Sequence, residues 1–346
     1  MEYTKLGRSD LVVSRICLGC MGFGDPAKGQ HSWTLDYERS AEVIQAALDV
    51  GINFFDTAIG YQGGTSEQYV GRALREAGRL RDSVVATKFL PRTPEEIAQG
   101  VSGRDHIQRS LAQSLKNLGT DCIDLYIYHM WDYNTPVLEV LEAMNAAIEE
   151  GTVRYLGISN CYAWQLAMAN EKASAAGLEG FISVQNHYNL LFREEEREML
   201  ALCQMEDIAT TPYSALAAGR LSRVPGQKPT RRLAEDKVAK SKYDATEAED
   251  DIVIARVHEV AEQLGVSMSD VAIAWLLTKA TAPVIGSTKA EQVRNVVRAT
   301  EVKLSPEQIA YLEEPYVPHR LVGVMDFNRP AEAAGRHVWP TEIGRA

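Results

Sequence analysis

Eight short apolar segments recur along the chain, and amphipathic stretches with helical spacing lie between them. Their first residues are 37, 31, 39, 30, 30, 25 and 75 positions apart, and six of these spacings fit one strand followed by one helix. Because a parallel sheet needs crossover helices and eight strands close around a packed interior, the pattern predicts one (β/α)8 TIM barrel. The expected strands are Ile16–Leu18, Asn53–Thr57, Val84–Lys88, Ile123–His129, Val153–Ser159, Ser183–Asn186, Ile208–Tyr213 and Pro283–Gly286.

The barrel changes the domain count that length suggests. At roughly 150 residues per domain, a chain of 346 residues suggests two domains. The strand spacing instead assigns residues 1–323 to one barrel and leaves 324–346 as a C-terminal extension. Tyr3–Val13, with turn residues at 7–10, is expected to form a hairpin that caps the barrel floor. Within the longest spacing, Ser222–Asp250 is polar and is expected to form a surface insertion before a helix at Ile252–Leu264.

Charge and hydropathy exclude several classes of partner. The net charge of −11 leaves no basic surface for nucleic acid or for an anionic membrane. The longest apolar run, Val271–Leu277, is far too short to cross a bilayer, and the first residues lack the apolar stretch of a secretory signal. We therefore expect a cytoplasmic protein without a membrane partner. Its oligomeric state is not predicted.

Two short motifs resemble cofactor or metal sites. Cys17 and Cys20 form a C-x-x-C pair, but no second pair or His-x-x-x-His completes a zinc site, so no metal is expected. Gly22–Ala27 matches G-x-G-x-x-A, the dinucleotide fingerprint of doubly wound sheets. That fingerprint requires a helix to open at the glycines, whereas a polar stretch containing Pro26 and Gly29 intervenes here. Gly22–Ala27 is therefore interpreted as a loop.

Four polar residues lie at or just after the carboxyl ends of successive expected strands. Asp56, Lys88 and His129 end three strands, and Tyr61 follows in a loop. Chemistry in this fold occurs at that edge, although each residue alone also has a structural interpretation. Together they suit carbonyl reduction. Lys88 would lower the pKa of Tyr61, Asp56 would hold Lys88, and neutral His129 would orient the carbonyl that Tyr61 protonates.

The same residues lie in segments that resemble the aldo-keto reductase family. N53-F-F-D-T-A, Tyr61 and S66-E-Q-Y-V-G-R-A-L resemble its signature around the catalytic Asp and Tyr, and T87-K, D124-L-Y-I-Y-H, G157-I-S-N and V184-Q-N continue it in order. The resemblance covers Tyr3 to about Gly323. H129-x-W-D and E314-P-Y-x-P-H resemble a bacterial branch, more distantly related to potassium-channel β subunits.

The resemblance implies hydride transfer from NADPH bound at the barrel mouth without a Rossmann domain. Positions matching the family's cofactor contacts, besides Asp56, are Gly19, Cys20 and Met21 near the ribose and nicotinamide, Ser159, Asn160 and Gln185 at the carboxamide, Tyr213 stacking on the ring, Ser214, Leu216, Gly219 and Leu221 at the pyrophosphate, and Gly286, Thr288, Lys289 and Gln292 at the 2′-phosphate. Many relatives carry Arg at the position of Thr288 and Asn at that of Val296. These departures leave NADH open as an alternative cofactor.

The expected substrate is a small-molecule carbonyl. With Tyr61, the side chains of Trp33, Phe89 and Trp131 would form an aromatic wall suited to bulky xenobiotic or secondary-metabolite ketones rather than only small sugars. Two other functions stay open. The chain is alternatively a cofactor-binding regulatory module, or a barrel enzyme in which Lys88 forms a Schiff base. Borohydride trapping on Lys88 would support the latter, and tight NADPH binding would argue against it.

Overall fold

The computed structural model describes residues 1–29, 31–224, 240 and 242–328. Eight parallel strands form one sheet in the order β10-β3-β4-β5-β6-β7-β8-β9, which confirms all eight predicted strand positions. The strands are β3 (Cys17–Gly19), β4 (Phe54–Asp56), β5 (Val84–Phe89), β6 (Ile123–Tyr128), β7 (Val153–Ser159), β8 (Ser183–Gln185), β9 (Ala209–Thr210) and β10 (Val284–Gly286).

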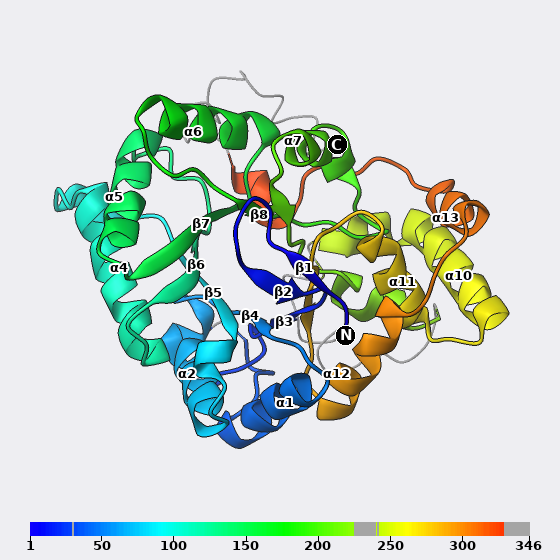
Figure 1. Cartoon of the computed structure of the whole chain (residues 1–346). Helices are drawn as coiled ribbons and strands as arrows, with labels where there is room; N and C mark the ends of the chain where they lie inside the picture. Colours follow the sequence, from blue (N-terminus) through cyan, green and yellow to red (C-terminus); the bar gives the residue numbers. More distant parts are fainter. Residues whose placement is uncertain (30, 225–239, 241, 329–346) are drawn as a thin grey trace.

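Backbone hydrogen bonds join the two ends of this sheet. The Ala282 N–H donates to the Thr210 carbonyl at 3.2 Å, and the Val284 N–H donates to the Pro212 carbonyl at 2.9 Å. The strands therefore close into a barrel, which the helices surround (Figure 1). Since neighbouring strands run parallel, their carboxyl ends all open on one mouth.

Helices follow the strands as the spacing predicts. Some of their N-termini carry side-chain caps, such as Ser102, whose hydroxyl accepts the Asp105 N–H at 3.0 Å. The main helices are α1 (Tyr37–Asp49), α2 (Thr65–Glu76), α3 (Pro94–Ala98), α4 (Gly103–Leu118), α5 (Val137–Glu149), α6 (Ala163–Ala175), α7 (Met199–Met205), α10 (Glu247–Leu264), α11 (Met268–Leu277), α12 (Ala290–Val296) and α13 (Pro306–Glu313).

Helix α11 was missing from the sequence prediction. The predicted helix at Ile252–Leu264 begins earlier, at Glu247, and a second helix, α11, precedes β10. The Ser267 side chain caps α11 in a reciprocal capping box with Asp270. Most of α11 is buried, so its sequence is nearly continuously apolar and lacks the periodicity of an exposed helix.

The N-terminal hairpin closes the end of the barrel opposite the mouth. Its strands, β1 (Tyr3–Lys5) and β2 (Val12–Ser14), pair antiparallel, and the hairpin lies across the centre of the barrel in Figure 1. Leu6, Leu11 and Val13 are buried against the interior side chains of the strands. The predicted floor cap is thus confirmed, and water is excluded from one end of the barrel.

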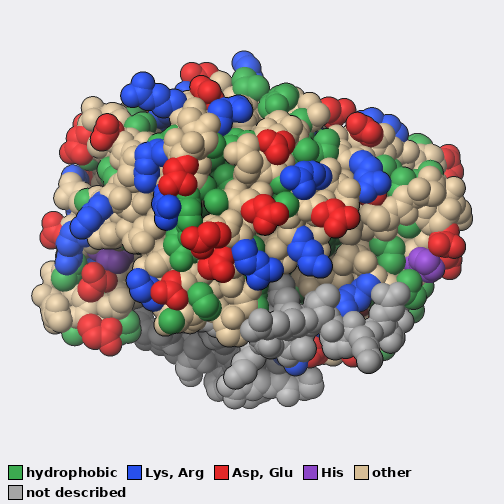
Figure 2. Space-filling model, turned by 90° about the horizontal axis from the view of Figure 1, so that it is seen from below, with side chains coloured by type: hydrophobic (Ala, Val, Ile, Leu, Met, Phe, Trp, Pro, Cys, Tyr) green, Lys and Arg blue, Asp and Glu red, His purple; other side chains and the backbone are tan. Residues whose placement is uncertain are grey.

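The described residues bear on two further features, membrane spans and metal centres. No single helix among these residues is long and apolar enough to cross a membrane. Of the described helices, only α10 and α11 taken together reach the required length and apolar composition, and the chain bends by 100° between them. The same residues contain no group of three or more His, Cys, Asp or Glu placed to hold a metal ion. Figure 2 shows acidic and basic side chains interspersed over the described part of one face.

Two predicted segments lie largely outside the described residues. These are the insertion at Ser222–Asp250, of which 225–239 and 241 are not described, and the extension at 324–346, of which 329–346 is not described. A short 3-10 segment, Gly323–Phe327, and Asn328 are the last described part of the chain.

Candidate active site

The four predicted polar residues meet at the mouth, and we call Asp56, Tyr61, Lys88 and His129 the catalytic group. The Lys88 Nζ donates to Asp56 Oδ1 at 2.6 Å, to the Thr57 carbonyl at 2.7 Å and to the Tyr61 hydroxyl at 3.5 Å. Asp56 and Lys88 are both buried. The adjacent strands β4 and β5 set this geometry, because each residue lies at the end of its strand.

Tyr61 and His129 complete the catalytic group from two loops. Tyr61 begins a turn in which Gln62 and Gly63 have left-handed backbone angles, and this turn leads directly into α2. The Tyr61 and His129 rings lie edge to face with centroids 6.1 Å apart. The Lys88 Nζ lies 5.0 Å from the Tyr61 ring centroid. A carbonyl oxygen near the tyrosine hydroxyl would therefore also lie near the imidazole.

Lys88 is held in its charged form. Burial lowers the pKa of Lys88, but the Asp56 carboxylate and Tyr61 outweigh that effect, so the pKa is raised overall. A Schiff-base lysine needs a depressed pKa, because only the neutral amine attacks a carbonyl. The environment of Lys88 therefore favours an electrostatic role over a nucleophilic one.

The electrostatics of Tyr61 differ from the sequence expectation. Burial raises the pKa of Tyr61, and the nearby Lys88 ammonium only partly offsets this, so the pKa is raised overall. We had expected Lys88 to lower it. The reason for the difference is that desolvation of the phenolate exceeds its attraction to an ammonium that Asp56 already partly neutralises. The side chain is thus a neutral phenol that can donate a proton.

His129 is neutral as predicted. Burial first, and then the Lys88 charge, lowers the pKa of His129 to about 3. Its Nδ1 is buried and has no hydrogen-bond partner within the described residues. A buried polar atom without a partner is uncommon in folded proteins and is frequently found at functional sites.

The predicted carboxamide contacts form one connected set at the ends of β7 and β8. The Asn160 Nδ2 donates to the His129 carbonyl at 3.0 Å and to Ser159 Oγ at 2.8 Å, and the Tyr213 hydroxyl donates to Asn160 Oδ1 at 2.8 Å. The Gln185 Nε2 donates to Asp56 Oδ2 at 2.9 Å. Two side-chain amides and a hydroxyl beside the catalytic group are the donors and acceptors that a carboxamide requires, so the residues fit a nicotinamide ring.

The ring of Tyr213 is supported by two residues that sequence reasoning missed. His187 stacks on Tyr213 with centroids 5.6 Å apart, and Phe192 stacks on His187 at 4.2 Å. The Lys242 Nζ lies 4.7 Å from the Tyr213 ring centroid. His187 lies in the family-like stretch N186-H-Y-N-L, and that stretch was the available signal. Lys242 comes from the polar insertion, where no pattern marked it.

The predicted pyrophosphate turn has an unusual backbone. Ser214, Ala217, Ala218 and Gly219 all have positive φ angles, and Leu216 and Leu221 belong to the same segment. These φ values let the segment fold back on itself, and the N–H groups of Ala217, Gly219 and Leu221 donate to the carbonyls of Ser214 and Leu216. The role of this turn at the pyrophosphate, which the resemblance implied, stays a prediction.

The other predicted cofactor residues lie at β3 and β10. Gly19 and Gly286 pair in adjacent strands, and the Cys20 N–H donates to the Asp56 carbonyl at 2.8 Å. Cys20 is fully buried, and Met21 follows it at the mouth. Beyond β10, the Ser287 hydroxyl donates to Gln292 Oε1 at 3.0 Å, and Lys289 precedes α12. Thr288 lies next to Gly22.

The aromatic wall is only partly assembled. Trp33 packs over Gly22, where an added Cβ would lie 3.3 Å from its ring. Trp131 contacts Tyr128, Tyr133 and Trp164, with centroids 6.0, 6.5 and 6.3 Å away. Phe89 is not part of this wall. Successive strand residues face opposite sides, so Lys88 points into the mouth and Phe89 packs outside the barrel on Tyr126 and Tyr128.

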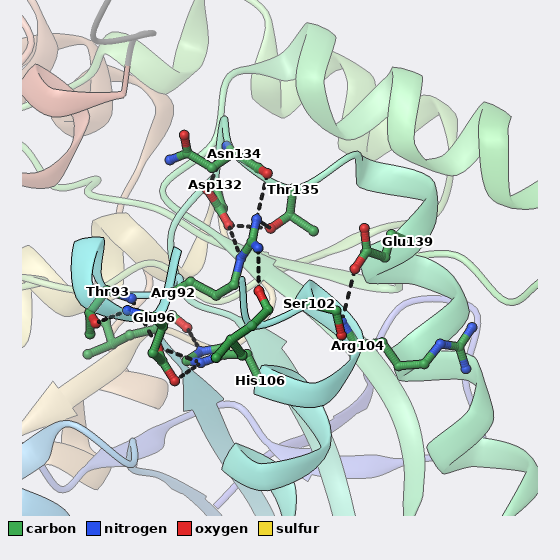
Figure 3. A network of polar contacts seen from close by, with 12 residues as sticks. Arg92, Thr93, Glu96, Ser102, Arg104, His106, Asp132, Asn134, Thr135 and Glu139 are labelled. Carbon is green, nitrogen blue, oxygen red and sulfur yellow. Dashed lines mark hydrogen bonds and ion pairs between the residues drawn. The ribbon is translucent and has the colours of Figure 1, made fainter. Parts of the chain in front are cut away.

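A polar clamp holds the loop that carries Trp131. Asn134 N–H donates to Asp132 Oδ1 at 2.7 Å, and Thr135 Oγ1 donates to Asp132 Oδ2. Arg92, from the loop after β5, donates to Thr135 Oγ1 at 2.8 Å and lies 3.8 Å from Asp132 (Figure 3). The H-x-W-D motif therefore joins the loops that follow Lys88 and His129. The H-x-W-D motif was recognisable in the sequence, whereas no pattern marked Arg92.

Together, the barrel and the buried Asp–Lys–Tyr arrangement at its mouth define a class of oxidoreductases. Residues 15–316 match the model of the Aldo/keto reductase family, and the chain belongs to that family. It is 38% identical over 338 residues to versiconal hemiacetal acetate reductase of Aspergillus parasiticus, covering 92% of this chain and 98% of that protein.

Two further comparisons agree with this family. The chain is 36% identical to a candidate aryl-alcohol dehydrogenase of Schizosaccharomyces pombe, covering 93% and 97% of the two proteins. A thermostable aldo-keto reductase solved with the inhibitor epalrestat has a TM-score of 0.73 and 27% identity, covering 91% of this chain and all of that one. The two named sequence relatives are fungal, so the bacterial branch and the distant relation to channel β subunits stay predictions.

Proposed function

We propose that this oxidoreductase reduces aldehyde or ketone carbonyls with NADPH, and that NADH is a weaker alternative donor. The observation that carries the proposal is the position of Lys88 Nζ, 2.6 Å from Asp56 Oδ1 and 3.5 Å from the Tyr61 hydroxyl. This arrangement places a neutral phenol beside a fixed positive charge. It supplies a proton donor and stabilises the phenolate that remains after the proton leaves.

Each member of the catalytic group has a separate task. Tyr61 donates its hydroxyl proton to the carbonyl oxygen, and Lys88 stabilises the resulting phenolate until solvent returns the proton. Asp56 holds Lys88 in place. Neutral His129 donates a hydrogen bond to the same oxygen, which a protonated imidazolium beside Lys88 would do only at an electrostatic cost.

The cofactor, when bound, supplies the hydride. Asn160, Gln185 and Ser159 would hold its carboxamide, and Tyr213 would support its ring. The positive-φ turn at 214–219 would receive the pyrophosphate. Lys289 would provide a charge for a 2′-phosphate. Thr288 and Val296, where many relatives carry Arg and Asn, are the reason that we expect only a modest preference for NADPH.

The proposed substrates are bulky carbonyls, including aromatic aldehydes and ketones of xenobiotic or secondary-metabolite type. Support comes from Trp33 and Trp131 beside the mouth and from the names of two relatives, one a reductase of a hemiacetal acetate and one an aryl-alcohol dehydrogenase candidate. We also propose that the enzyme acts in the cytoplasm and binds neither nucleic acid nor membrane.

A substrate panel with both cofactors tests this function. NADPH and NADH oxidation would be followed with aromatic aldehydes, bulky ketones and small sugars. We expect the highest kcat/KM with aromatic or bulky carbonyls and NADPH. Absence of turnover on every carbonyl, with tight NADPH binding, would support the regulatory alternative. Borohydride trapping of substrate on Lys88 would support the Schiff-base alternative.

A further inference from the structure

Asn328, at the end of the described chain, has a side chain whose four hydrogen-bonding positions are all occupied. The residue is 7% exposed. Its Nδ2 donates to the Asn160 carbonyl at 3.0 Å and to Gln165 Oε1 at 2.9 Å. Its Oδ1 accepts from the Tyr133 hydroxyl at 3.0 Å and from Gln165 Nε2 at 3.1 Å. A buried amide satisfied at every position fixes the geometry of its partners.

Asn160, the first of these partners, has a left-handed backbone and several roles. Its φ of +53° is in a region that Asn adopts more readily than most residues with a side chain, and its surroundings hold it there. The same residue contacts the His129 carbonyl and accepts the Tyr213 hydroxyl. Any shift of the Asn160 backbone would therefore move the groups proposed to orient the nicotinamide.

We propose that Asn328 is a positioning residue that acts through Asn160 to set the affinity for the nicotinamide cofactor. This inference rests on the proposed function. It is the Asn328 side chain that joins the end of the C-terminal segment Gly323–Asn328 to the carboxamide site, although 168 residues separate it from Asn160 in sequence.

The chemistry of the contact requires an amide. In Asn328→Asp the shape is retained, but a carboxylate oxygen would face the Asn160 carbonyl and Gln165 Oε1, which are both acceptors. Asn328→Ala removes all four bonds. Both variants should weaken the hold on Asn160. Tyr133→Phe removes one bond to Oδ1 and the bond that Gln165 Nε2 donates to the Tyr133 hydroxyl at 3.0 Å, but it leaves both bonds of Asn328 Nδ2 and should have a smaller effect in the same direction.

The test measures NADPH dissociation constants by quenching of tryptophan fluorescence, which needs no turnover. We expect Asn328→Ala and Asn328→Asp to raise the Kd about tenfold. Tyr133→Phe should raise it by a smaller factor. The control, Asp326→Ala, changes an exposed residue of the same segment and should leave the Kd unchanged. Circular dichroism and thermal unfolding of each variant would identify any loss of fold.

A double-mutant cycle separates positioning from general support of the fold. If Asn328 acts through Asn160, then Asn160→Ala/Asn328→Ala should bind NADPH no more weakly than Asn160→Ala alone. Additive losses, or a lowered Tm with an unchanged Kd, would overturn the inference. A wild-type protein that binds neither NADPH nor NADH would contradict the proposed function itself, and the inference would be lost with it.

Discussion

The catalytic group and the surrounding rim of the mouth are built in different ways. Asp56 and Lys88 are ends of adjacent strands, and both are buried. The outer rim, which we define as the loop Trp131–Thr135 and the segment Gly323–Asn328, consists of loops joined by side-chain hydrogen bonds. The barrel is therefore expected to determine the reaction, and the loops to determine how the cofactor and the substrate fit.

The largest effect is expected from a variant that removes the ion pair between Lys88 and Asp56 in the barrel. Lys88→Met would leave the Asp56 carboxylate buried without its cation, which typically costs about 3 kcal/mol or more of unfolding free energy. Carbonyl reduction should fall by about a thousandfold or more. Urea unfolding and steady-state kinetics would check both values.

Two variants control that measurement. Lys116→Met changes an exposed lysine and should alter neither stability nor rate. The double variant Asp56→Asn/Lys88→Met should recover part of the lost stability, because the buried charge is removed with its partner, but none of the activity. A Lys88→Met protein as stable and as active as the wild type would mean that the pair is incidental.

A smaller and more selective effect is expected at the outer rim. Asp132→Ala would remove the bonds that the Asn134 N–H and the Thr135 hydroxyl donate to the Asp132 carboxylate, and so loosen the Trp131 loop. We expect the KM for a bulky aromatic aldehyde to rise several-fold, while kcat and the KM for propanal change little. The matched control is Asp121→Ala, which changes an exposed aspartate just before β6. Equal losses on small and bulky substrates would instead place Asp132 with the catalytic group.

The features that the sequence predicted lie mainly in the barrel, and those that it missed lie mainly in the loops of the outer rim. The predicted strand ends indicated that Asp56, Lys88 and His129 would lie close together, because parallel strands bring their carboxyl ends to one edge, and Tyr61 follows Asp56 in a short loop. The direction of the Tyr61 pKa shift was not predictable, since it depends on burial. Phe89 was misplaced although the alternation from Lys88 already indicated the opposite face. Arg92 and Asn328 act through loop contacts, for which the chain carries no periodic signal.

A still smaller effect concerns stability away from the mouth. His319 Nε2 lies 3.1 Å from Asp250 Oδ1, and both side chains are buried. Burial lowers the pKa of His319, but the Asp250 carboxylate and the Val317 carbonyl raise it more, so the folded value exceeds the unfolded one. The stabilisation is therefore complete below the unfolded pKa of about 6.5 and is lost as the pH rises through the folded pKa.

Thermal unfolding of wild type and His319→Gln at several pH values measures this contribution. The wild type should have the higher Tm at pH 6, and the difference should shrink as the pH increases to 9. A difference that stays constant or grows with pH would show that the pair is not charged in the folded protein.

The smallest expected effect concerns His129, which should not titrate in the pH range of the assay. Because the pKa of His129 is about 3, its ring should remain neutral between pH 5 and 9. The pH profile of kcat/KM should therefore show no inflection near 6.5 that His129→Gln removes. Such an inflection would mean that the imidazole is charged in the working enzyme and that its role is not that of a neutral donor.

The measurement that tests the central claim most directly is Tyr61→Phe, which removes the proton donor and little else. NADPH affinity and the rate of 4-nitrobenzaldehyde reduction would be measured on the same preparation. We predict a Kd for NADPH within about twofold of wild type and a kcat lower by about a hundredfold or more. Undiminished reduction by this variant would contradict the assignment of Tyr61 as the acid and, with it, the mechanism built on the catalytic group.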